Sequence, residues 1–480
     1  MRILVVKLHL LGDVLQALHV LRSVRQAHPE AEIDFVTKPA YASLVEDCAL
    51  ATRVFRFPVS ESLGAYDLLI NMSPDDEAVQ WSSRISAERR VGAQLGPDGA
   101  RQLWGELGVY YASSIMFRQL RRLNLVDLWI LHAGLPMVGD ADLFSSDEEE
   151  ERSRAIAQRF AIDPARPLVC LQPGSSFAFR RWPPEDFAAV GKALLRQGYQ
   201  IAVMGSADEA PLVDEILRAM GGGISTAGLD LAELRAFFRR ASLLITNDTG
   251  PMHLSSAIGL AHLALFFAAS SPIDTGGYRS GNVSIAATVP CAPCDKPRDC
   301  TIDFACRSQV TPAVVLAVAE QLLSNDANLQ WNENVVICRS TREASGALIQ
   351  ERAVSARPPM SELLREIVAE VWFRQWVKGG SATETLRARF AGVLREVSVA
   401  KELRELAEDS ARLRDALVRS TGFTPRIQVL QPVAKLFSML PSLLVMARSH
   451  RPQPDARQVA MQFAQELAQC SGDLYAGYCD

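Results

Sequence analysis

The sequence has no uninterrupted apolar run of about 18 residues, the length that a transmembrane helix needs, so no membrane-spanning helix is expected. Its amino end, MRILVV, lacks the basic leader, apolar core and cleavage site of a secretory signal, and we therefore expect a cytoplasmic protein. The 50 basic and 55 acidic residues nearly cancel, to a net charge of −5, which indicates neither disorder nor a nucleic-acid surface. No internal repeat or low-complexity tract is present.

What the sequence does contain is a regular alternation of short apolar runs with helical patterns. The 480 residues suffice for two or three domains of roughly 150 residues each. Strand, helix and strand in this rhythm predict an α/β fold with parallel strands and right-handed crossovers. The expected strands form two series: Ile3 to Val6, Ile33 to Val36 and Leu68 to Ile70, then Leu168 to Leu171, Ile201 to Met204, Leu243 to Thr246 and Leu263 to Phe267.

We predict three parts, residues 1–140, 141–340 and 341–480. Near the first boundary, Ser146 is placed to cap a helix whose acidic first turn contains Glu149, and we expect this charged start to be solvated. Beyond about 340 the strand pattern fades, so the last part is expected to be all-α. Residues 427–446 within it fit a buried helix, a contact between protomers of a homo-oligomer, or a helix on a membrane surface.

The first candidate site follows the first strand, at Gly12 and Asp13. Ligands of α/β proteins bind at the carboxyl ends of parallel strands, where a glycine allows close approach and Asp13 would face the ligand. An ordinary helix cap is the alternative for Asp13. The loop lacks the spaced glycines of a dinucleotide fingerprint, which argues against a nicotinamide enzyme.

Two further loops in the second series are suited to hold phosphate. The turn at Gly174 and Ser175 is followed by Arg180, and turn amides, hydroxyls and a guanidinium are good phosphate donors. Surface arginines with Trp182 as a packing anchor are the alternative. After the strand that ends near residue 247, a helix start at Pro251 would leave its first N–H groups free to bind an anion. The residues there are Asp248, Thr249, Gly250 and His253, and His253 alone could equally be structural.

Together these three motifs resemble glycosyltransferase family 9, which contains the ADP-heptose:lipopolysaccharide heptosyltransferases. The resemblance covers about residues 1 to 325 and implies a GT-B fold, two Rossmann-like domains facing each other across a cleft. It implies that Asp13 is the catalytic base and that Glu233 lies near the place where the family has an acidic residue that binds the sugar or ribose of the donor. It also places Arg180 where the family usually has a lysine. The donor-binding residues that it implies are Gly12, Gly174, Ser175, Arg180, Glu233, Asp248, Thr249, Gly250 and His253.

The resemblance also implies the reaction: inverting transfer of a heptose from an ADP-heptose donor to a hydroxyl, with no catalytic metal. The acceptor would be lipopolysaccharide, another glycolipid or a protein, and peripheral contact with the inner membrane fits such an acceptor. Two alternatives are a nucleotide-sugar epimerase of the same build and a non-catalytic binding or scaffold protein.

A cysteine cluster is the last chemical feature. Cys291, Cys294, Cys300 and Cys306 are spaced C-x2-C-x5-C-x5-C, and four thiolates make a closed tetrahedral site. We expect a structural metal, zinc or iron, and free buried thiols are the alternative. Some relatives of the family, bacterial autotransporter heptosyltransferases, are similar in carrying a cysteine-rich segment with structural iron.

Overall fold

The structure, a computed structural model, describes residues 1–96, 99, 101–104, 123–289, 292–294, 300–324 and 335–352. Nearly all of these residues belong to one compact unit. A second unit contains most of β6 (Arg101–Trp104) and residues 357–480, and the latter lie outside the described residues, so the all-α extension stays a prediction. None of the described helices has both the length and the apolar character needed to cross a membrane.

The first lobe is built on a parallel sheet with the strand order β3-β2-β1-β4-β5. Residues Ile3 and Val5 face one side of β1 while Leu4 and Val6 face the other, the alternation that fully buried strands show. The lobe consists of β1 (Arg2–Val6), α1 (Leu11–Ala27), β2 (Glu32–Thr37), α2 (Pro39–Asp47), β3 (Arg53–Arg56), β4 (Ala65–Asn71), α3 (Asp76–Ser82), β5 (Ser86–Leu95) and α5 (Leu125–His132).

The second lobe contains an eight-stranded sheet with the order β14-β13-β12-β11-β10-β7-β8-β9. Its central strands are parallel, whereas β13 and β14 add an antiparallel hairpin at one edge. The strands are β7 (Leu168–Gln172), β8 (Gln200–Val203), β9 (Ile224–Ser225), β10 (Leu243–Asn247), β11 (His262–Phe266), β12 (Val283–Ala287), β13 (Val335–Arg342) and β14 (Leu348–Arg352). The hairpin carries strand structure to Arg352, past residue 340, where the sequence pattern had indicated only helix.

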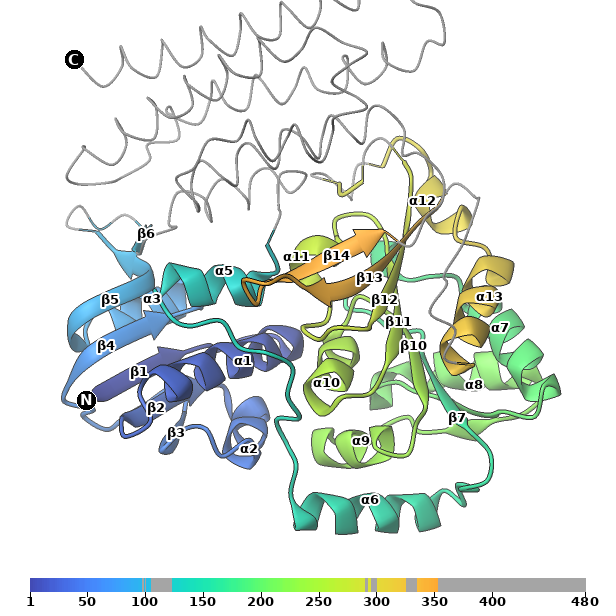
Figure 1. The fold of residues 1–480 in the computed structure, drawn as a ribbon, viewed down its shortest axis with the longest axis horizontal. Helices are drawn as coiled ribbons and strands as arrows, with labels where there is room; N and C mark the ends of the chain where they lie inside the picture. Colours follow the sequence, from blue (N-terminus) through green and yellow to red (C-terminus); the bar gives the residue numbers. More distant parts are fainter. Residues whose placement is uncertain are drawn as a thin grey trace, which may run out of the picture. The chain divides into compact units, whose positions relative to one another are not determined.

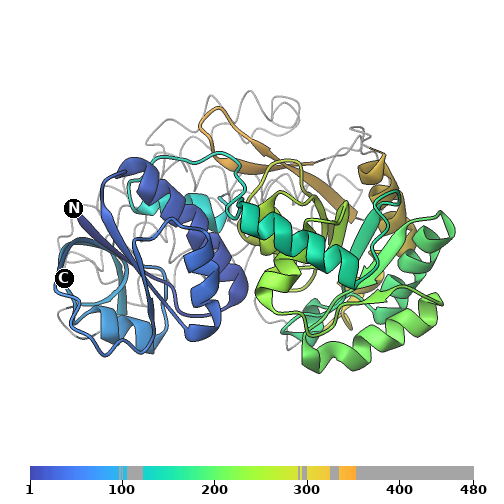
Figure 2. The ribbon, with the colours of Figure 1, turned by 90° about the horizontal axis from the view of Figure 1, so that it is seen from below.

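Helices cover both faces of this second sheet (Figure 1). On one face α7, α8 and α13 pack together, and on the other α9 contacts both α6 and α10. The helix α6, in blue-green, is also visible in Figure 2. The helices of the lobe are α6 (Asp147–Arg159), α7 (Pro184–Arg196), α8 (Ala210–Met220), α9 (Leu231–Phe238), α10 (Gly250–Ile258), α11 (Pro272–Thr275), α12 (Ala305–Ser308) and α13 (Pro312–Leu323).

The acidic start of α6 is solvated at most of its residues, as predicted, but Glu149 is buried. Ser146 does cap the helix, because its hydroxyl accepts a bond from the Glu149 N–H at 3.1 Å. However, the Glu149 side chain is 2% exposed and lies 2.8 Å from the Arg235 guanidinium, which also bonds Asp47 of the first lobe at 2.7 Å. A buried carboxylate needs a paired charge, and the arginine supplies it. The expectation for Glu149 was wrong because its partner is distant in the sequence.

A second polar cluster joins the lobes near β14. Asp127, on α5, accepts the Tyr278 hydroxyl at 2.5 Å and the Leu348 N–H at 2.7 Å. Burial raises the pKa of Asp127 to about 6, although both hydrogen bonds oppose the shift. Arg342 lies over the Tyr278 ring and pairs with Asp140 at 2.8 Å. The β13–β14 hairpin is therefore bonded directly to a helix of the first lobe.

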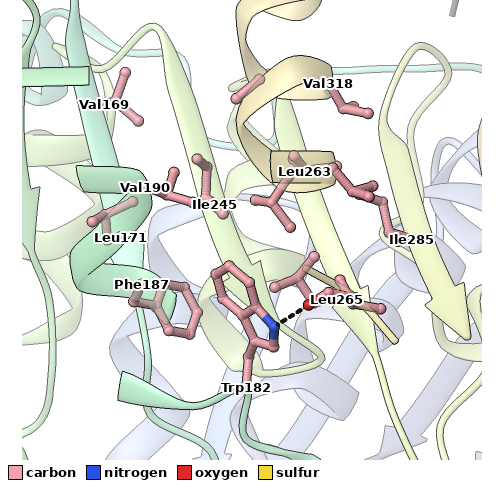
Figure 3. Close-up of a cluster of buried hydrophobic side chains, with 14 of the residues drawn as sticks. Val169, Leu171, Trp182, Phe187, Val190, Ile245, Leu263, Leu265, Ile285 and Val318 are labelled. Carbon is pink, nitrogen blue, oxygen red and sulfur yellow. Dashed lines mark hydrogen bonds between the residues drawn. The ribbon is translucent and has the colours of Figure 1, made fainter. Parts of the chain in front are cut away.

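Trp182 anchors the core of the second lobe (Figure 3). Its side chain is 1% exposed, its indole N–H donates to the Val310 carbonyl at 2.8 Å, and its ring meets Phe187 edge-on with centroids 5.0 Å apart. The surrounding side chains come from four strands and two helices: Val169, Leu171, Val190, Ile245, Leu263, Leu265, Ile285 and Val318. Trp182 thereby fixes the segment that contains Arg180.

We expect Trp182→Phe to lower the stability of the second lobe by about 1–3 kcal/mol, since it leaves the buried Val310 carbonyl unpaired and removes packed volume. The urea unfolding midpoint measures the change. Trp81→Phe is the control, because Trp81 is only partly buried, at the edge of the first core. Equal midpoints for Trp182→Phe and the unmodified chain would contradict this role.

Candidate functional site

Asp13 lies in the first turn of α1, directly after β1. It is not the helix cap, a position that Leu10 occupies, so the alternative role of Asp13 as a cap is wrong. Its carboxylate lies 2.7 Å from the ammonium of Lys7, which also donates to the Met72 carbonyl at 3.3 Å. The Lys7 side chain is only 10% exposed, whereas that of Asp13 is 41% exposed. A nearly buried lysine at the end of the sheet therefore holds a solvent-accessible carboxylate in place.

The first turn of α1 packs against the first turn of α10 at two glycines. A methyl group added to Gly12 would lie 2.6 Å from Cδ2 of His253, and one added to Gly250 would lie 2.7 Å from Cδ2 of Leu11. Such distances are far below van der Waals contact, so any larger residue at either position would separate the helices. This contact brings Asp13 next to the start of α10.

The start of α10 presents backbone N–H groups. Thr249 is the N-cap, in extended conformation with φ −149°, and its side chain makes no capping hydrogen bond to the helix. Pro251 fixes the geometry of the first turn. The N–H groups near Gly250 therefore point out of the helix with the positive end of its dipole, an arrangement that favours an anion.

A cationic side chain lies beside this helix start. Arg180 ends a short 3-10 helix, and its guanidinium is 3.5 Å from the Asp248 carboxylate, which also accepts the Thr275 hydroxyl at 3.4 Å. The Asp248 side chain is only 6% exposed, so it has little surface for contact with a ligand and serves mainly to orient Arg180. The Nε of Arg180 is buried without a hydrogen-bond partner in the described part of the chain. Donor capacity therefore remains on Arg180.

The Gly174–Ser175 turn lies at the same sheet edge but is organised by its neighbours. Arg181 donates two bonds, of 2.8 and 2.6 Å, to the Ser175 carbonyl, so it shapes the turn. The Glu209 carboxylate lies against Gly174, so closely that a side chain there would collide with it. Sequence reasoning missed Glu209, although Ser206 and Glu209 form the S-x-x-E capping box that marks a helix start after β8.

Glu233 is engaged elsewhere. One of its oxygens accepts a bond from Arg159 at 2.6 Å, and the other accepts the Asp230 N–H at 3.2 Å in a capping box that begins α9. The structure thus brings Gly12, Asp13, Gly250 and His253 together, and Asp248 with Arg180, but uses the Glu233 carboxylate to build α9. A donor-binding role for Glu233 stays a prediction.

The cysteine cluster is described only in part, because Cys291 lies outside the described residues. Cys306 is buried in the core, and the sulfur of Cys300 accepts the Phe304 N–H at 3.2 Å. Within the described ranges, the three side chains whose ligand atoms lie within 4.8 Å of one another are His9, Asp75 and Glu77. The four-cysteine metal site stays a prediction.

Comparison with known proteins finds a family match in the middle of the chain. The model of glycosyltransferase family 9 (heptosyltransferase) matches residues 129–302. Lipopolysaccharide heptosyltransferase 1 of Pseudomonas aeruginosa is 25% identical over 326 residues, which cover 63% of this chain and 88% of that protein. The chain carries a glycosyltransferase family 9 domain. It is a heptosyltransferase-like glycosyltransferase, as the sequence motifs predicted.

Solved structures of the family share the fold. A family 9 glycosyltransferase from Veillonella parvula aligns with a TM-score of 0.54 at 20% identity, covering 68% of this chain and 98% of that one. Escherichia coli ADP-heptose lipopolysaccharide heptosyltransferase II aligns with a TM-score of 0.52 at 20% identity, covering 68% and 99%. This likeness confirms the predicted α/β fold for the part of the chain that aligns.

His253 is an uncharged contact in the candidate site. Burial lowers its pKa from 6.5 to about 4, and the negative charge of Asp13 opposes that shift only in part. The imidazole of His253, which lies against Gly12, is therefore neutral at pH 7. Between pH 6.5 and pH 4 the unfolded chain binds a proton that the folded chain excludes, so folding stability falls as the pH is lowered through this window.

We expect His253→Gln to lose stability less steeply on acidification than the unmodified chain, by up to about 1.4 kcal/mol per pH unit below about pH 6.5. Urea unfolding at about pH 7 and about pH 4.5 measures the two slopes. His19 and His262, whose pKa values burial lowers to about 3, stay in both proteins and preserve part of the dependence. Parallel slopes would show that His253 binds a proton as readily in the folded chain as in the unfolded chain, which contradicts its lowered pKa.

Proposed function

We propose that this chain transfers a heptose from ADP-heptose to a hydroxyl of a lipopolysaccharide acceptor, with inversion and without a catalytic metal. The relatives aligned over most of their length are lipopolysaccharide heptosyltransferases, which favours that donor and acceptor class. The observation that carries the proposal is the contact between the first turns of α1 and α10. It sets an accessible carboxylate, Asp13, beside the anion-attracting start of a helix.

The first chemical step assigned to this geometry is proton removal. A sugar hydroxyl is a poor nucleophile at neutral pH, and Asp13 would accept its proton as the oxygen attacks the anomeric carbon. Lys7 holds the carboxylate at 2.7 Å, so the base is oriented before the acceptor arrives. Attack from the face opposite the diphosphate inverts the configuration at that carbon.

The second requirement is stabilisation of the leaving group. Negative charge grows on the diphosphate oxygens as the glycosidic bond breaks, and groups that bind this charge more strongly in the transition state raise the rate. The N–H groups at Thr249 and Gly250 and the guanidinium of Arg180 are the donors at this edge. Together they would take the place of a divalent cation.

Arg180, rather than a lysine, presents a planar fork of donors to the diphosphate. The guanidinium is oriented by Asp248 and by the face of Phe177, 5.4 Å from its ring centroid. Its position is thereby restricted from two sides. We infer that Arg180 binds two oxygens of the diphosphate at once, which a lysine could not do with one ammonium.

We expect two substitutions to separate chemistry from donor binding. Asp13→Asn keeps the shape of the side chain but removes the base, and it should lower the transfer rate by about 100-fold or more. ADP affinity should remain close to that of the unmodified chain. Arg180→Gln should weaken ADP binding about tenfold or more, because a charge-assisted bond is lost.

Calorimetry with ADP and a transfer assay with ADP-heptose and lipopolysaccharide acceptor measure both effects. An Asp13→Asn enzyme with normal turnover would remove the base from the mechanism. An Arg180→Gln enzyme with normal ADP affinity would contradict the assignment of Arg180 to the diphosphate of the donor. Consumption of the donor without any acceptor would instead indicate an epimerase.

The cysteine cluster is proposed to hold a structural metal outside the reaction. We expect about one equivalent of zinc or iron per chain in purified protein, and its loss from a Cys294→Ser, Cys300→Ser variant. Because the metal takes no part in chemistry, added chelator should leave the initial rate unchanged. Elemental analysis that finds well under one equivalent would establish the alternative of free thiols.

A further inference from the structure

Asn247, the last residue of β10, is fully buried. It bonds two other loops at the carboxyl ends of the strands of the second sheet. We call this end of the sheet the donor edge, and it comprises the Gly174–Ser175 turn, Arg180 and the start of α10. The Asn247 amide nitrogen donates to the Pro173 carbonyl at 2.8 Å and to the Gly174 carbonyl at 3.4 Å. Its amide oxygen accepts the N–H of Trp182 at 3.0 Å. One side chain therefore connects three segments of the second lobe.

The register of the sheet explains why these segments meet. Parallel pairing places Thr246 of β10 opposite Gln172 of β7, so the two strands end side by side. Asn247 then stands beside the turn that leaves β7, while its backbone leads directly into the start of α10. Trp182 lies two residues after Arg180, and its backbone N–H donates to the Asn247 amide oxygen, which ties this segment to β10.

Each connected segment contributes a different part of the donor edge. The backbone after Asn247 leads to the N–H groups of α10, the Pro173 and Gly174 carbonyls belong to the turn, and Trp182 ends the segment of Arg180. Asn247 has no exposed surface, so it cannot itself be a ligand for the donor. It can only act through the positions of the groups around it.

We propose that Asn247 is a positioning residue that sets the distance between Arg180 and the start of α10. The proposal rests on the proposed function, since these are the two groups assigned to the diphosphate. An amide is required because the site needs a donor on one side and an acceptor on the other. Aspartate would be the closest replacement in shape, and it would turn an acceptor toward two carbonyl oxygens.

Asn282 provides a matched control in the same lobe. It is also buried, donates to the Ser256 hydroxyl at 3.1 Å and to the Arg279 carbonyl at 3.4 Å, and accepts the His262 N–H at 3.3 Å. It precedes β12 and therefore lies at the amino ends of the parallel strands, whereas the donor edge lies at their carboxyl ends. Asn282→Asp should disturb folding in the same way without touching the donor edge.

The test compares ADP with adenosine, which lacks the diphosphate. We expect Asn247→Asp to weaken ADP binding about tenfold or more while adenosine binding changes less than about threefold. In the transfer assay, KM for ADP-heptose should rise at least as much. Asn282→Asp should leave ADP affinity unchanged. If Asn247→Asp does not fold, Asn247→Ser, which adds no charge, takes its place.

A double-mutant cycle with Arg180→Gln separates positioning from general destabilisation. If Asn247 acts by placing Arg180, its substitution should weaken ADP binding far less once Arg180 is already glutamine. An undiminished effect in the Arg180→Gln background, or equal losses in Asn247→Asp and Asn282→Asp, would overturn the proposal. An unmodified chain that fails to bind ADP would instead overturn the proposed function itself.

Discussion

Close contact between the starts of α1 and α10, at Gly12 and Gly250, is the constraint on which the candidate site depends. Each helix follows the carboxyl end of a buried parallel strand, so each start is fixed by the core of its own lobe. The absence of a side chain at the two glycines allows the helices to touch. Through this contact, a carboxylate from one lobe and a helix terminus from the other face the same small region.

The rest of the site is held by buried polar groups rather than by apolar packing alone. Lys7 fixes Asp13, Asp248 fixes Arg180, and Asn247 joins the Pro173–Gly174 turn to the segment of Trp182. At a distance from the site, Arg235 and Asp127 bond residues of the opposite lobe. Removing one partner from such a pair leaves the other buried and unsatisfied, which costs more than the bond itself contributes. The bonds of Arg235 and Asp127 therefore help to specify where the lobes meet.

Much of this arrangement follows from the sequence. The seven expected strands match β1, β2, β4, β7, β8, β10 and β11 within a few residues, since an apolar run such as Leu243 to Thr246 is typical of a buried strand in an α/β pattern. The shorter or more polar strands β3, β5, β9 and β12 were not predicted. Ser146 was correctly predicted as a helix cap because capping acts over three residues. The helix starts after β1 and β10 were correctly predicted because helix starts at strand ends have local sequence signatures.

What the sequence did not reveal depends on partners that are distant along the chain. The residues around Glu149 indicate a solvated charge, and only the fold brings Arg235 to it. Asn247 is predictable as the end of a strand, but its connection to Trp182 requires the register of β7 against β10. The β13–β14 hairpin was missed because strands paired at a sheet edge need little apolar alternation of their own.

A crystal structure with bound ADP is the most direct measurement of the central claim. The account predicts a diphosphate within hydrogen-bond reach of the N–H groups at Thr249 and Gly250 and of the Arg180 guanidinium, with its terminal phosphate directed toward Asp13. A diphosphate bound away from the start of α10, or one separated from Asp13 by protein, would contradict it.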